Sequence, residues 1–85
     1  MKDKSLEEIK RGEQAEKILS NEVYREAFNK VKNNIVDAMQ NSPLSDDVTH
    51  NRLVIALQTL TQIEKALKDI MQTGKMAKLQ VQDPR

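Results

Sequence analysis

The fold is decided by residues 53–71, which read LVIALQTLTQIEKALKDIM. Apolar residues recur there every three or four positions, at Leu53, Ala56, Leu57, Leu60, Ile63, Leu67, Ile70 and Met71. This spacing places them on one face of a long α-helix, and such a face has to be covered by another helix. We therefore expect a helical protein built around this stripe.

A second apolar stripe precedes the first and predicts the partner helix. Its members follow the spacing of a helix that packs along its length, namely Tyr24, Phe28, Val31, Ile35, Ala38 and Met39. Pro43 cannot continue a helix, and it keeps Ser42 out of the helical conformation. This helix is therefore expected to cover about 22–41.

The loop after Pro43 prepares the start of the next helix. Ser45 or Asp46 can cap it, and Gly74 is a suitable residue to end it. The third helix is thus predicted over about 47–73. Because the loop is short, the two helices are expected to pair as an antiparallel hairpin.

An additional helix is expected at the N-terminus, over about 6–19. Ser5 and Glu8 have the spacing of a capping box, in which each side chain satisfies a free backbone amide at the helix start. Gly12 lies inside this helix at a cost of about 1 kcal/mol relative to alanine, which makes it the least secure of the three. Asn21 favours a break or a new cap before the second helix.

The remaining segment, 75–85, has apolar residues at Met76, Leu79 and Val81 and could form a short helix, an extended arm or a strand. We expect one helical domain over 1–74 and a short C-terminal arm over 75–85, which a partner can order. The predicted fold class is all-α.

The size of the chain favours association. A chain of 85 residues with 38% hydrophobic and 2% aromatic residues can bury only a thin core, so docking or oligomerisation is expected. The third predicted helix also exceeds the second in length, and its far end needs cover from the first helix or from a second subunit. The residues expected to bind a partner are Ile63, Leu67, Ile70, Met71, Lys75, Met76, Lys78 and Leu79.

Few residues in the chain are suited to chemistry. It has no cysteine and a single histidine, so thiolate metal sites and acyl-transfer triads are not expected. Asp46, Asp47 and His50 lie within one helical turn, but we interpret the two acids as complements of a helix N-terminus and expect no metal site. Thr73-Gly74-Lys75 lacks the upstream glycine of a phosphate loop. We predict no enzyme activity and no cofactor.

The charges disfavour general binding to nucleic acid. The net charge is +1, from 14 basic and 13 acidic residues, and Arg25 and Lys30 alternate with Glu22 and Glu26. The first two helices could be read as a helix-turn-helix, and Lys75, Lys78 and Arg85 give a modest basic character to the C-terminus. Nucleic acid is therefore a possible but disfavoured partner. The apolar runs are far shorter than the ~20 residues of a membrane span.

Three segments resemble a known group of proteins. They are Arg11-Gly12-Glu13-Gln14-Ala15-Glu16-Lys17-Ile18-Leu19, Asn41-Ser42-Pro43 and Thr73-Gly74-Lys75-Met76-Ala77. Together they are similar to small helical proteins that are encoded with the virion structural genes of tailed bacteriophages and prophages. The resemblance implies a small virion or head-assembly protein without catalytic residues.

From these observations we expect a non-enzymatic phage structural or assembly protein. It would pack its helices onto a head or portal component, or onto further copies of itself, in the virion or in the cytoplasm of the infected host cell. One alternative is a DNA-packaging accessory resembling a small terminase subunit. A second alternative is a small inhibitor of a host enzyme.

Overall fold

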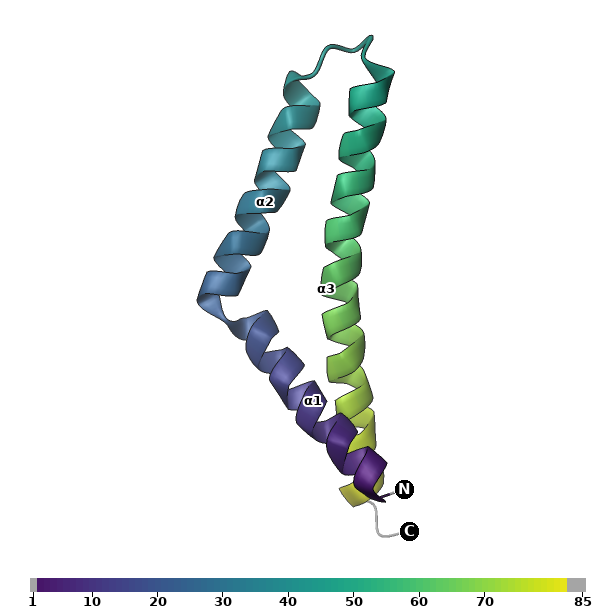
Figure 1. The fold of residues 1–85 in the computed structure, drawn as a ribbon. Coiled ribbons are helices and arrows are strands. Elements are labelled where there is room, and N and C mark those ends of the chain that lie inside the picture. The colour runs from purple at the N-terminus through teal and green to yellow at the C-terminus, as the bar shows by residue number, and fades with distance from the viewer. Residues whose placement is uncertain (1, 83–85) are drawn as a thin grey trace.

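The computed structural model describes residues 2–82 and contains three α-helices: α1 (Lys2–Ser20), α2 (Glu22–Asn41) and α3 (Asp47–Gln82). Within these residues there is no strand, and the predicted all-α fold, a hairpin with an additional N-terminal helix, is confirmed. Figure 1 shows α1 and α2 following one another along the length of α3, with the start of α1 beside the end of α3. The molecule is an elongated body of 61 × 24 × 16 Å.

The junction between α1 and α2 is a one-residue break at Asn21. Its backbone is extended, with φ −68° and ψ 126°, and its Oδ1 accepts a hydrogen bond from the Tyr24 amide at 2.9 Å. On the other side of the break, Ser20 Oγ donates to the Glu16 carbonyl at 2.8 Å. The predicted break is confirmed, because a capping side chain ends the continuous run of helical hydrogen bonds.

The loop between α2 and α3 also has the predicted caps. Ser42 is extended, and its Oγ donates to the Ala38 carbonyl at 2.6 Å at the end of α2. Asp46 accepts a hydrogen bond from the Thr49 amide at 3.1 Å and so caps α3. His50 Nε2 lies 3.1 Å from the Pro43 carbonyl oxygen, which ties the loop to the first turn of α3.

Two predicted helix boundaries are wrong. Helix α1 begins at Lys2, so Ser5 lies within its first turns and is not the N-cap of a capping box. Helix α3 does not end at Thr73 but continues to Gln82, and Gly74 has no positive φ. Lysine, alanine, leucine and glutamine dominate the last turns and favour helix, and contact with α1 stabilises them further.

This extension also corrects the predicted C-terminal arm. Residues 75–82 are the last turns of α3 and do not form a separate segment. Residues 83–85, which include the predicted basic residue Arg85, lie outside the described part of the chain.

The core lies where α1 crosses the end of α3. Among residues 4–82, the buried ones are Gly12 and Ala15 of α1 and Gly74 and Ala77 of α3. Within the same range α2 has no buried residue, and its apolar side chains are at most half-buried. The molecule therefore packs tightly at one end through its smallest residues and loosely at the other through larger ones.

Candidate functional site

The end of α3, where the sequence predicted a docking site, is shaped by a close contact between two glycines. A Cβ atom on Gly12 would lie 2.8 Å from the Cα of Gly74 and 3.3 Å from the carbonyl oxygens of Ile70 and Met71. A Cβ atom on Gly74 would lie 2.8 Å from the carbonyl oxygen of Glu8. Both glycines are needed because any side chain would force the two helix backbones apart.

Alanines continue this contact on both helices. Ala15 follows Gly12 by three residues and Ala77 follows Gly74 by three, and their exposed fractions are 3% and 4%. Helices that meet through glycine and alanine approach closely along that face. Gly12, which we expected to weaken its helix, is thus the residue that allows α1 to dock on α3.

The crossing covers some of the residues predicted to bind a partner. Leu67 and Met71 are half-buried. Met71 borders hollows that it shares with α1 residues, among them Ile9, Glu13, Glu16 and Leu19. The sequence allowed either the first helix or a second subunit to cover this part of α3. In the structure the chain's own N-terminal helix, α1, lies there.

Two other predicted residues remain accessible beyond the crossing. Met76 and Leu79 are 63% and 67% exposed, and Val81 near them is also exposed. At about 100° per residue, Met76 and Leu79 lie within roughly 60° of each other, on a side of α3 different from that of Gly74 and Ala77. They form a small apolar patch on a helix end that α1 holds in place.

The predicted cations Lys75 and Lys78 lie on the flank of this patch. Both are exposed, and both border a hollow of about 110 Å³ that Glu13 and Glu16 of α1 border from the other side. Opposite charges thus face one another across the α1–α3 groove. This arrangement favours docking of α1 and reduces the attraction of the two lysines for a phosphate backbone.

The last two predicted residues, Ile63 and Ile70, lie on the same side of α3 as Gly74, within about 40° of it around the helix. Both are exposed, although they belong to the apolar stripe of the sequence. Ile70 borders a shallow hollow together with Glu8 and Arg11, at the edge of the α1 crossing. The structure therefore divides the predicted site into a covered seam, an exposed end patch and two exposed isoleucines beside the seam.

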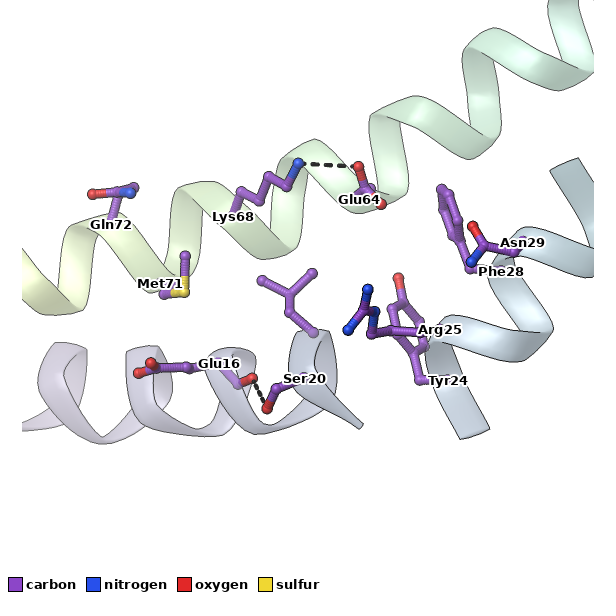
Figure 2. A pocket seen from close by; sticks show the side chains of 11 residues that line it. Glu16, Ser20, Tyr24, Arg25, Phe28, Asn29, Glu64, Lys68, Met71 and Gln72 are labelled. Carbon is purple, nitrogen blue, oxygen red and sulfur yellow. Dashed lines mark hydrogen bonds and ion pairs between the residues drawn. The ribbon is translucent and has the colours of Figure 1, made fainter. Parts of the chain in front are cut away.

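Sequence reasoning missed a cleft at the junction of the three helices. It has a volume of about 690 Å³, and α1, α2 and α3 all contribute to its lining, as Figure 2 shows. Its apolar side chains are Leu19, Tyr24, Phe28 and Met71. The ring centroids of Tyr24 and Phe28 are 6.1 Å apart, with a tilt of 38°. Only the three-dimensional meeting of three helix segments creates this cleft.

Polar groups surround the apolar lining of the cleft. Lys68 Nζ lies 3.1 Å from Glu64 Oε1 on α3, as drawn in Figure 2, and Arg25 extends from α2. The hydroxyl of Tyr24 is buried and finds no hydrogen-bond partner within the described residues. One feature of the sequence could have indicated the cleft, namely Glu64, a charged residue within the apolar stripe between Leu60 and Leu67.

At the opposite end of the molecule, the carboxyl group of Asp46 has a lowered pKa. Hydrogen bonds from the side chain and the backbone amide of Thr49 lower the pKa of the Asp46 carboxyl below its ordinary value, and His50 adds a smaller effect in the same direction. This is the electrostatics of a helix cap. Among the described residues, no group of three or more His, Cys, Asp or Glu side chains is placed to hold a metal ion.

Comparison with known proteins gave no significant match to a protein-family model, to a curated protein or to a solved structure. None of the helices described over residues 2–82 combines the length and the apolarity needed to cross a bilayer.

Proposed function

We propose that this chain is a non-enzymatic assembly protein of a tailed phage and that it docks onto a head or portal component through the end of α3. The observation that carries this proposal is the exposed patch of Met76 and Leu79 beside Lys75 and Lys78. Large apolar side chains on an exposed helix end favour contact with another protein. The flexible thioether of Met76 suits an irregular groove on such a partner.

The position of the resembling segments supports this proposal. Two of the three segments similar to phage proteins, 11–19 and 73–77, meet at the contact between Gly12 and Gly74. They therefore belong to one structural unit, a rigid helix crossing that presents the patch at a fixed angle. A preformed patch loses little conformational entropy on binding.

The residues of the patch indicate what surface its partner has. The partner would offer an apolar groove for Met76 and Leu79, with acidic side chains at the rim to meet the exposed lysines. We place this contact in the virion or in the cytoplasm of the infected host cell during assembly. The genes on either side of the coding sequence are expected to encode capsid, portal or tail proteins.

The proposal is tested in the phage that carries the gene. Mass spectrometry of purified particles and of assembly intermediates should detect the wild-type protein. The double variant Met76→Glu with Leu79→Glu should reduce its incorporation about tenfold or more, because each glutamate would be placed in an apolar groove. Val23→Glu, at an exposed position of α2, is the matched control and should be incorporated normally. Absence of the wild-type protein from both samples, or equal incorporation of the double variant, would contradict the proposal.

The DNA-packaging alternative has a separate test. If the lysines bound DNA, retention on a DNA column would fall with salt and would disappear in Lys75→Glu with Lys78→Glu. We expect no such retention, because Glu13 and Glu16 share the groove with these lysines. Salt-sensitive retention that the double variant abolishes would replace the docking proposal with the packaging one.

A further inference from the structure

The cleft at the junction of the three helices follows from the way the chain bends at Asn21. On one continuous helix, at about 100° per residue, the contact residues Gly12 and Ala15 would lie roughly 170° away from Tyr24 and Phe28. The break at Asn21 turns both groups toward α3, but neither group continues through the break itself. A length of α3 between its two contacts is therefore partly uncovered, and the cleft of about 690 Å³ lies there (Figure 2).

The walls of this cleft are held in place. The contact between Gly12 and Gly74 fixes α1 on α3, and the single residue Asn21 connects α1 to α2 without slack. Closing the cleft would require the loss of the Asn21 cap or the separation of the two glycines. A hollow of about 300–1,000 Å³ that exists before binding is the usual form of a small-molecule site.

The cleft also collects the aromatic side chains of the protein. The chain has one tyrosine, one phenylalanine and no tryptophan, and both rings, Tyr24 and Phe28, line the cleft with their centroids 6.1 Å apart. Leu19 and the thioether of Met71 complete the apolar part of the lining. Aromatic rings pack well against other rings, and a thioether makes favourable contacts with a ring edge. This lining therefore suits a flat aromatic group.

The polar groups of the cleft favour an anion at its α2 end. The hydroxyl of Tyr24 is buried and has no hydrogen-bond partner among the described residues, so its donor is unused. Arg25 is exposed and forms no ion pair within residues 2–82, whereas Lys68 is held by Glu64 at 3.1 Å. The other acid of the lining, Glu16, lies at the α1 end in Figure 2, away from Arg25. A carboxylate at the α2 end would pair with both the hydroxyl and the guanidinium.

From this lining we infer that the cleft binds an aryl carboxylate, a small molecule that joins a flat aromatic group to a carboxylate. The aromatic group lies between Leu19, Phe28 and Met71, and the carboxylate accepts hydrogen bonds from Arg25 and Tyr24. Because the Tyr24 hydroxyl is covered in the free protein, its ring has to rotate slightly toward the ligand. This rotation breaks no hydrogen bond of the hydroxyl.

The first test follows the binding of naphthylacetate to the full chain by NMR. The single tyrosine and the single phenylalanine give ring signals that report on the cleft alone. Both signals should shift with a Kd of about 1 mM, the affinity expected of a ligand of this size. The uncharged analogue naphthylacetamide has the same shape and should bind about tenfold more weakly, because it lacks the charge that pairs with Arg25.

The second test uses variants that separate the roles of the polar groups. Arg25→Gln should raise the Kd of naphthylacetate about tenfold. Lys30→Gln, the same change of charge at an exposed position of α2 outside the cleft, should leave the Kd unchanged. Tyr24→Phe should raise the Kd about fivefold but should not lower the thermal midpoint of the ligand-free protein, because the hydroxyl has no hydrogen bond to lose there. A hydroxyl with a structural role would instead lower that midpoint when it is removed.

Three results would overturn the inference. Ring signals of Tyr24 and Phe28 that stay unchanged at several millimolar naphthylacetate would show that the cleft is not occupied. Equal affinities for the acid and the amide would show that no charge is recognised. An Arg25→Gln protein that binds the acid as tightly as the wild type would place the carboxylate elsewhere. The cleft contains neither Met76 nor Leu79, so each result leaves the proposed docking to its own experiment.

Discussion

The two halves of α3 pack by opposite means. The C-terminal half meets α1 through glycine and alanine, which bring the helix backbones together until no Cβ atom fits between Gly12 and Gly74. The N-terminal half runs beside α2, and the larger apolar side chains there, such as Leu57, Leu60 and Phe28, remain half-buried. The comparison teaches that, in this small chain, close approach of two helix backbones excludes solvent from a contact more completely than large apolar side chains on diverging helices do.

The largest expected effect is at the tight contact. Gly12→Ala should raise intrinsic helix propensity by about 1 kcal/mol, yet we expect it to destabilise the protein by roughly 3 kcal/mol, because the new methyl group meets backbone atoms. Urea unfolding followed by circular dichroism measures the change. Gln14→Ala, on an exposed side of α1, should be neutral or slightly stabilising. A stabilised Gly12→Ala protein would show that α1 and α3 are not in close contact.

A smaller loss is expected at the loose contact. Phe28→Ala should cost about 2 kcal/mol, less than the 3–5 kcal/mol of a fully buried phenylalanine, because the ring is only half-buried. Val31→Ala at an exposed position of α2 should stay within about 0.5 kcal/mol. The same unfolding measurement applies to both. If Phe28→Ala cost more than Gly12→Ala, the ranking of the two contacts would be reversed.

The break between the two contacts depends on a capping side chain. Asn21→Ala should destabilise the protein by about 1 kcal/mol, because the Tyr24 amide loses its acceptor, whereas Asn21→Ser should retain most of the stability. Asn33→Ala, at an exposed mid-helix position, should instead be slightly stabilising. Thermal unfolding of the three variants distinguishes these cases. Equal behaviour of the variants at positions 21 and 33 would mean that α1 and α2 form one continuous helix.

The smallest expected effect is a pH dependence at the far end of the molecule. Hydrogen bonds from Thr49 depress the pKa of Asp46 in the folded state, so this cap stabilises the protein above the unfolded pKa of about 3.8 and loses its effect as the pH falls through the lower folded value. An NMR titration of the carboxyl carbon should show the depressed pKa. Thr49→Val removes the hydroxyl donor and should bring the pKa part of the way back toward its ordinary value. An unchanged pKa in that variant would mean that the threonine hydroxyl does not contribute.

Local sequence signals were sufficient for the hairpin. Pro43, the caps at Asn21 and Asp46 and the two apolar stripes act within a few residues of themselves, so the ends of α2 and the start of α3 were predicted correctly. The same local rules failed at Gly74, because a glycine after an apolar helix has the signature of a C-cap. Its actual role depends on a residue 62 positions away in the sequence, Gly12, which no local rule includes.

The candidate site was predicted only in part for a related reason. The apolar stripe predicted that α3 needs cover along its length, but it did not distinguish the half-buried Met71 from the exposed Ile63 and Ile70. That distinction depends on the angle at which α1 crosses α3. The cleft around Tyr24 was missed because its lining comes from three separate helices.

The sequence by itself determined that this protein is helical, where its hairpin turns and which residues form its apolar stripes, because helix periodicity and capping are properties of neighbouring residues. Only the tertiary structure decided that α3 continues beyond Gly74, that α1 covers its end and which apolar residues remain exposed. The physical reason is steric. Two helix backbones can come into direct contact only where both helices lack a side chain at the crossing point. This condition depends on Gly12 and Gly74 together, which lie far apart in the sequence.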